Sequence, residues 1–248
     1  MCLIAFDWQA EKQQLVLVAN RDEFYQRPSQ ALHPWPEYPA LYAGKDLQQG
    51  GTWLGVTQQR RFAALTNIRA PGHDPEQPLS RGNLVLDFLT SELNAETWLQ
   101  QLASTAQRYG LYNLICFDGT NLWYSHNHPE FHYQKLSSGL YGLSNAHLNT
   151  PWPKTELAKQ QLAAWQHQTA EPVPADLLNR RLPFADEQLP QTGVPLAWEQ
   201  LLSSQFILSP QYGTRCSTSL HITSQQLIIN EILWQDSGEQ QQITHFTL

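Results

Sequence analysis

Met1-Cys2-Leu3-Ile4-Ala5-Phe6 is the stretch that decides how the rest of the chain is interpreted. Cys2 follows the methionine directly and is small enough for that methionine to be removed, which would leave a thiol and a free α-amine on one residue. The two groups titrate near about pH 8.5 and 8, so this residue can supply a nucleophile and its own base. The apolar run after Cys2 predicts a buried strand, and the alternative interpretation is a cysteine that merely starts it.

A second β-rich run, residues 15–19, follows the polar segment 7–14, and this pattern predicts a β-hairpin. Antiparallel pairing across its turn sets Cys2 opposite residues 19–22. We therefore expect Asn20-Arg21-Asp22-Glu23 to bring a guanidinium and a carboxylate beside the thiol. Adjacent strand residues face opposite sides, so only one of Arg21 and Asp22 can face Cys2 unless the strand bulges or ends there.

The composition of the 248-residue chain predicts one domain, 1–248, with a sizeable core, since 41% of its residues are hydrophobic. A net charge of −7 without a Lys/Arg cluster argues against nucleic acid or an anionic membrane as the main partner. Three widely spaced cysteines predict no disulfide framework. No segment approaches the about 18 apolar residues of a membrane span, and no signal peptide is recognisable, so we expect a cytoplasmic protein.

Strand and helix patterns alternate along the rest of the chain. Residues 50–56 and 61–69 predict a second hairpin, in which 50–55 is interpreted as a turn and a tryptophan-anchored strand. Ser80 and Asn94 are predicted N-caps of two helices, and apolar spacing predicts a third helix over 154–168. Further strands are expected over 112–117, 122–124, 139–145, 206–208, 214–223, 227–234 and 243–246.

Two proline-rich parts, 27–39 and 172–195, are expected to be irregular, with a short helix at 176–181 inside the second. The order of strands, helices, strands, helix and strands predicts an α+β fold. We expect two antiparallel sheets packed face to face with helices outside, which is a four-layer αββα sandwich.

Short blocks spread along the chain resemble the NRDE family, also called the transport and Golgi organisation protein 2 family. Asn-Arg-Asp-Glu alone would be a weak signal, but the tryptophan-bearing blocks follow it in the right order. The resemblance extends to about residue 220. The matching blocks are Met1-Cys2, 20–23, 50–55, 66–69, 80–82, 142–145, 150–154 and 212–215.

This family in turn looks like the cysteine branch of the N-terminal nucleophile (Ntn) hydrolases, which includes bile salt hydrolase and penicillin V acylase. The resemblance implies the αββα sandwich and cleavage of a non-peptide amide or acyl C–N bond in a small molecule. It also implies a site made of a nucleophile, two arginines, a carboxylate and two asparagines. Residue by residue these are Cys2, Arg21, Asp22, Asn67, Asn145 and Arg215.

In the implied site, Arg21 lies against the thiolate, Asp22 hydrogen-bonds the α-amine, and Arg215 is the distal arginine. The chain departs from the pattern, because those enzymes separate the first arginine and the aspartate by two residues. An arginine lowers a thiol pKa, and a carboxylate can orient the amine that returns a proton to the leaving nitrogen. The alternative is that Arg21, Asp22 and Arg215 form a structural ion-pair network.

Asn67 and Asn145 resemble the asparagines that flank the oxyanion position. Attack on an amide builds negative charge on its oxygen, and each neutral donor in a dry pocket can stabilise that charge by about 3–4 kcal/mol. The alternative is that these residues simply cap strand ends. No cofactor is expected for this chemistry.

A second function stays open, since the resemblance also implies haem trafficking and lipid or acyl-CoA homeostasis. The chain would then be a binding protein that reuses the fold, with haem as a candidate ligand. His126, His128 and His132 lie within seven residues and could bind zinc, but their alternation around Pro129 favours a solvated hairpin. No metal site is predicted there.

Overall fold

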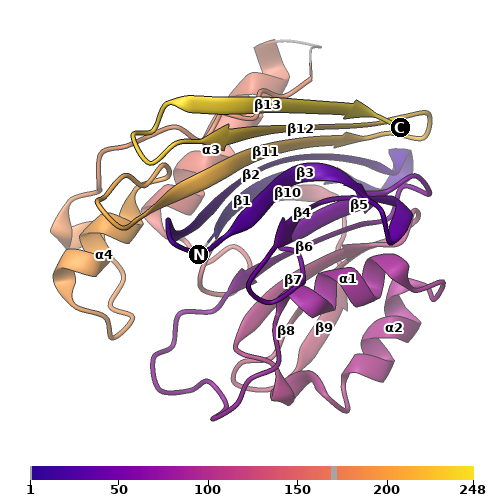
Figure 1. Ribbon diagram of the computed structural model, residues 1–248, viewed down its shortest axis with the longest axis horizontal. Helices are drawn as coiled ribbons and strands as arrows, with labels where there is room; N and C mark the ends of the chain where they lie inside the picture. Colours follow the sequence, from indigo (N-terminus) through magenta and orange to yellow (C-terminus); the bar gives the residue numbers. More distant parts are fainter. Residues whose placement is uncertain (1, 169–171) are drawn as a thin grey trace.

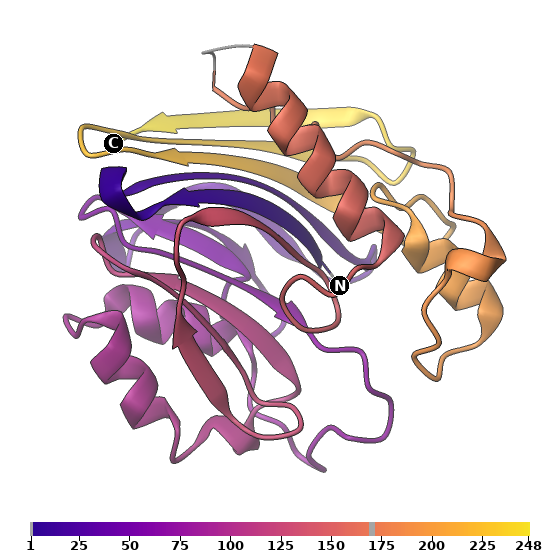
Figure 2. The same cartoon turned by 180° about the vertical axis from the view of Figure 1, so that it is seen from behind.

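A computed structural model describes residues 2–168 and 172–248. Two antiparallel sheets lie face to face and helices cover their outer faces (Figure 1). The predicted α+β, four-layer αββα arrangement is confirmed. The view from behind shows α3, Pro153–Gln168, lying across the outer face of the sheet that holds the N-terminal strands (Figure 2).

The six-stranded sheet has the order β10-β1-β2-β11-β12-β13. The first predicted hairpin is confirmed, and Cys2 pairs directly with Arg21. The strand predicted at 206–208 is wrong, because Leu208 makes only an isolated bridge to Gly213. The strands of this sheet are β1 Cys2–Gln9, β2 Gln14–Phe24, β10 Gly139–Leu143, β11 Tyr212–Ile222, β12 Leu227–Trp234 and β13 Gln240–Thr247.

The seven-stranded sheet runs in sequence order from β3 to β9. The second predicted hairpin is confirmed as β5 and β6. The irregular segment predicted at 27–39 is wrong, since most of it belongs to two strands, and Pro34 pairs with Tyr42 on the edge strand. The strands are β3 Ser29–Trp35, β4 Tyr38–Asp46, β5 Leu54–Thr57, β6 Phe62–Asn67, β7 Tyr112–Phe117, β8 Leu122–His126 and β9 His132–Lys135.

Three predicted helices are confirmed and one is wrong. The predicted N-cap Ser80 is also wrong, because α1 begins at Gly82 with Arg81 at its N-cap and no side-chain cap hydrogen bond. Asn94 caps α2 through a 2.8 Å hydrogen bond that its Oδ1 accepts from Thr97 N. The helix predicted at 176–181 is absent, whereas α4 begins directly after Pro195, where no helix was predicted. The remaining helices are α1 Gly82–Thr90, α2 Ala95–Leu102 and α4 Leu196–Ser203.

Alternation along β1 sends its side chains into two different apolar layers. Ile4, Phe6 and Trp8 lie between the sheets, whereas Leu3 and Ala5 pack under α3. Each large apolar side chain fully buried in this way contributes about 1.5–3 kcal/mol to folding. With both faces buried, β1 has a fixed register, and this fixes the position of Cys2 at its start.

Several strand ends meet at one end of the sandwich. β1 begins where β2 is finishing, and the ends of β6 and β10 are joined by a 2.8 Å hydrogen bond from Arg69 N to Asn145 O. The Thr66 hydroxyl on β6 also donates to Ser144 O. Polar residues from four strands are therefore collected around the start of β1.

Candidate active site

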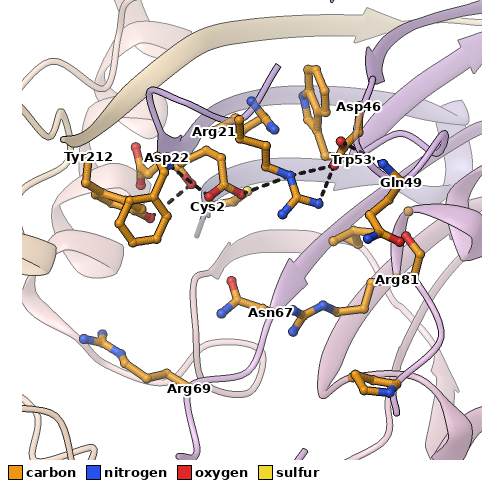
Figure 3. Close-up of a pocket in the computed structure, with 18 of the residues that line it drawn as sticks. Cys2, Arg21, Asp22, Asp46, Gln49, Trp53, Asn67, Arg69, Arg81 and Tyr212 are labelled. Atoms are coloured by element: carbon orange, nitrogen blue, oxygen red, sulfur yellow. Dashed lines mark hydrogen bonds and ion pairs between the residues drawn. The ribbon is translucent and has the colours of Figure 1, made fainter. Parts of the chain in front are cut away.

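Cys2 lies in the wall of a cleft of about 610 Å³ that opens at this end of the sandwich (Figure 3). The residue is 9% exposed, so it is largely screened from bulk water while still lining the cleft. The Ser144 hydroxyl donates a 3.1 Å hydrogen bond to Cys2 O and holds the strand at its first residue. The cleft has the size of small-molecule sites.

Arg21 occupies the position opposite Cys2 on β2 and also lines the cleft. Its guanidinium is stacked on Trp53, with Cζ 4.1 Å from the ring centroid. The side chain is buried, and Nη1 has no hydrogen-bond partner among the described residues. A buried cation is costly unless its charge is balanced, so Arg21 is suited to a negative charge arising in the cleft.

Asp22 follows Arg21 and also lines the cleft, which regular strand alternation alone would not allow. The neighbouring strand β11 carries a bulge at this level, because Thr214 pairs with Asp22 but Cys216 pairs with Arg21. Thr214 Oγ1 donates a 2.7 Å hydrogen bond to Asp22 Oδ1. The predicted convergence of Arg21 and Asp22 is thus found at an irregular part of the sheet.

Arg215 is the additional residue in that bulge. Its Nη1 donates to Phe24 O and Tyr25 O, at 3.2 and 2.9 Å, and the side chain does not line the cleft. The structure therefore does not bring Arg215 together with Cys2. Its contacts instead hold the chain that continues from the end of β2.

Asn67 and Asn145 are joined, but they occupy different positions. Asn145 Nδ2 donates to Asn67 O and Oδ1, at 3.0 and 3.1 Å. Asn145 is buried and does not line the cleft, whereas Asn67 does. The amide group available to a molecule in the cleft is therefore that of Asn67, with Asn145 holding it in place.

Burial has the largest effect on the pKa of Cys2 and raises it. Asp22 and Glu23 add to the rise, while Arg21 opposes it. Arg21 thus lowers the pKa of the thiol as predicted, but the loss of water on burial outweighs the guanidinium and the net change is a rise. Burial therefore opposes ionisation of the thiol, and a base beside the thiol would assist its attack.

Lys154, at the start of α3, is a buried cation close to the site that the sequence reasoning did not select, and it does not line the cleft. Its Nζ donates a 2.8 Å hydrogen bond to Leu202 O. Burial lowers its pKa to about 8, and attraction to Asp22 opposes this fall. Burial and the attraction between Lys154 and Asp22 also oppose each other at Asp22: burial raises the pKa of this carboxyl group and Lys154 lowers it. The signal in the sequence was a lysine closing the apolar Pro-Trp-Pro segment.

The histidines form a separate cluster beside β8 and β9. The His126 and His147 rings stack with centroids 4.4 Å apart, and those of His126 and His132 lie 5.5 Å apart. Within residues 2–168 and 172–248, no group of His, Cys, Asp or Glu has an arrangement that could hold a metal ion. The described helices are all too short or too polar to cross a membrane.

A family model described as "Transport and Golgi organisation 2" matches residues 1–231. The chain belongs to this family. It is 33% identical over 242 residues to the Transport and Golgi organization protein 2 homolog of Homo sapiens, covering 88% of this chain and 87% of that protein. The Drosophila melanogaster Transport and Golgi organization protein 2 is 25% identical over 254 residues, covering 91% and 89% of the two chains.

Two solved structures are also similar to this Transport and Golgi organisation 2 family member. One is a Caenorhabditis elegans ortholog of N-acylethanolamine-hydrolyzing acid amidase, 10% identical with a TM-score of 0.42, covering 88% of this chain and 92% of that one. The other is the C2A mutant of conjugated bile acid hydrolase from Clostridium perfringens, 9% identical with a TM-score of 0.41, covering 99% and 96%.

Proposed function

We propose that the cleft is the active site of an Ntn-type cysteine hydrolase that cleaves a non-peptide amide or acyl C–N bond of a small molecule. Cys2 would act after removal of Met1. The observation that carries the proposal is the position of Cys2, at the first residue of a buried strand and facing a cleft opposite Arg21. A cysteine that only filled the core would not need a cleft or a buried guanidinium.

The raised pKa of the thiol fits a nucleophile that needs a base to take its proton. The freed α-amine would take the thiol proton, and the thiolate would attack the substrate carbonyl carbon. Arg21 would stabilise the thiolate, while the Asn67 amide would donate to the oxyanion that forms. Asp22 would accept from the α-amine and orient it.

Collapse of the tetrahedral intermediate breaks the C–N bond, and the leaving nitrogen takes the proton held by the α-ammonium. The acyl group stays on Cys2 as a thioester. Water then attacks this thioester with the α-amine as base, which releases the carboxylic acid and restores the thiol. Each proton that the α-amine takes up is given back within the same half-reaction, to the leaving nitrogen in acylation and to the Cys2 sulfur in deacylation.

Intact mass of the purified protein, before and after an acylating p-nitrophenyl ester, tests this proposal. We expect loss of Met1 and one added acyl group that the Cys2→Ala variant does not take up. Cys116 and Cys216 are buried and provide internal control thiols. Hydrolysis of an acyl-amide panel should fall by at least about 10³-fold in Cys2→Ala. Retained Met1 in an active preparation, or unchanged turnover in Cys2→Ala, would overturn the proposal.

The alternative, haem binding without turnover, would use the same cleft. The described residues lining it include no histidine, but Cys2 and Tyr212 are of types that can bind haem iron. Haem titration of the wild type and of Cys2→Ala, followed at the Soret band, tests this alternative. A saturable shift lost in Cys2→Ala, with no amide in the panel hydrolysed, would replace the hydrolase proposal.

A further inference from the structure

We propose that the cleft binds a substrate that carries an anionic group, a carboxylate or a phosphate, and that Arg81 recognises this group. The inference rests on the proposed function, because it names the class of compound that the same cleft would take. It comes from the pairing of the arginines in the cleft wall, which are Arg21, Arg27, Arg69 and Arg81.

Two of these arginines are neutralised by carboxylates of the chain. Arg27 lies 2.6 Å from Asp46 and 3.8 Å from Glu23. Arg69 lies 2.9 Å from Glu199. The pairing with Arg27 balances the charge of Asp46 and Glu23, two carboxylates that also line the cleft. The third, Asp22, is attracted to Lys154.

Arg21 and Arg81 form no ion pair with a described residue. In the proposed reaction the charge of Arg21 is taken by the Cys2 thiolate. The proposed reaction forms no negative charge that would pair with Arg81. It is therefore the cleft arginine whose charge remains available for a group on the substrate.

Arg81 is held in a fixed position from the side away from the cleft. Its Nη1 donates a 2.9 Å hydrogen bond to Leu111 O. Asp74, which does not line the cleft, attracts the guanidinium, although its Oδ1 is used by Leu111 N at 2.8 Å. Gly110 makes room for this arrangement, since a Cβ there would lie 3.3 Å from Arg81 Cζ. Nη1 is committed to Leu111, which leaves the remaining guanidinium N–H groups for a ligand.

Arg81 also lies directly before α1, and Ser80, Arg81 and Gly82 all line the cleft. The first turn of α1 contains no acidic residue. Gly51 lets this helix end approach closely, because a Cβ there would lie 2.5 Å from the Gly82 carbonyl carbon. The positive end of the helix dipole therefore adds to the attraction that the Arg81 guanidinium exerts on an anion.

The matched probes for this inference are N-hexanoylglycine, its neutral glycinamide, and N-hexanoyl-O-phosphoethanolamine. Calorimetric titration into Cys2→Ala measures binding without chemistry, so a failed hydrolase proposal would not hide the result. We expect the anionic probes to bind at least about 10-fold tighter than the glycinamide, and the two anions to show whether carboxylate or phosphate is preferred.

In Cys2→Ala/Arg81→Met, the preference for the anionic probes should disappear while glycinamide binding stays the same. Arg81→Lys keeps the charge and should retain part of the preference, which separates recognition from loss of the Leu111 hydrogen bond. Arg108→Met, at an exposed arginine that does not line the cleft, is the control. Equal affinity for charged and neutral probes, or a preference that survives Arg81→Met in a folded protein, would overturn the inference.

Discussion

At the scale of single residues, Asn67 and Asn145 show how one residue type can serve two purposes. Both lie at the end of a predicted strand, yet only Asn67 lines the cleft. The amide group of Asn145 instead donates hydrogen bonds to Asn67. We therefore expect Asn67→Ala to slow acylation of Cys2 by a p-nitrophenyl ester by about 10²–10³-fold. The KM of the ester should change little, because the lost hydrogen bond would form mainly in the transition state.

Asn145→Asp keeps the shape of the side chain but removes its donors. We expect a smaller loss, about 10–10²-fold in the acylation rate, because Asn67 would be present but less well oriented. Asn179→Ala, at an exposed asparagine, is the control and should behave as wild type. If Asn145→Asp were slower than Asn67→Ala, Asn145 would be the group that contacts the oxyanion.

The roles of the predicted site residues came from the family resemblance, and local geometry added the positions of some of them. The hairpin pattern placed Cys2 opposite residues 19–22, a range that includes its observed partner Arg21, and the strand pattern placed Asn67 at a strand end. Asp22 lies beside a bulge at Arg215, on a strand almost two hundred residues away, and accepts a hydrogen bond from Thr214 directly before that bulge. No local pattern encodes the register shift, so the position of Arg215 outside the cleft could not be predicted.

At the scale of secondary-structure elements, a buried ion pair links Glu199 on α4 to Arg69 in the cleft wall. Arg69 and Glu199 are 2.9 Å apart and their side chains are each 5% exposed. Glu199 Oε1 also accepts hydrogen bonds from Thr192 N and Oγ1, at 2.8 and 2.5 Å. Removal of the carboxylate would leave a buried guanidinium without a counter-charge and would release the segment before α4.

Glu199→Gln should therefore destabilise the protein by about 3–5 kcal/mol in urea unfolding, as expected when a buried ion pair loses one partner. The double variant Arg69→Met/Glu199→Met removes both charges and should recover most of that loss. Glu156→Gln breaks the exposed pair with Lys159 and should cost less than about 1 kcal/mol. A Glu199→Gln protein as stable as Glu156→Gln would show that α4 is held by its apolar contacts alone.

The elements that were mispredicted share a dependence on distant partners. Prolines argued against strands at 27–39, but β3 lies at a sheet edge, where a missing N–H costs no ladder bond. In the segment predicted as a helix at 176–181, a backbone carbonyl is used in a tertiary contact instead of a helical hydrogen bond. Asn20 Nδ2 donates to Leu178 O at 2.8 Å. Amphipathic spacing, in contrast, was sufficient for the three helices that pack directly on a sheet.

At the scale of the whole molecule, buried ionisable groups make stability depend on pH in opposing directions. Burial raises the pKa of Asp22 and Glu231, so the folded state holds their protons more tightly and they favour folding as the pH falls. Burial lowers the pKa of His126 to about 4, with His147 and His132 adding to the fall. The unfolded histidine takes up a proton near about pH 6.5.

Between about pH 6.5 and 4 the unfolded state therefore binds more protons at His126 than the folded state does, and this contribution to stability is lost as the pH falls. His126→Phe keeps the ring that stacks on His147 but cannot titrate. Its melting temperature, measured by calorimetry from pH 7.5 to 4, should fall less steeply than that of the wild type. Because the His126 ring is only half-buried, the difference will be smaller than one full proton would give. The opposing carboxyl groups of Asp22 and Glu231 are unchanged in the variant, so their contributions cancel in the comparison.

The control is His167→Gln, at an exposed histidine on α3, which should follow the wild-type curve. Parallel curves for the wild type and His126→Phe would mean that the histidine cluster opens and hydrates before the protein unfolds.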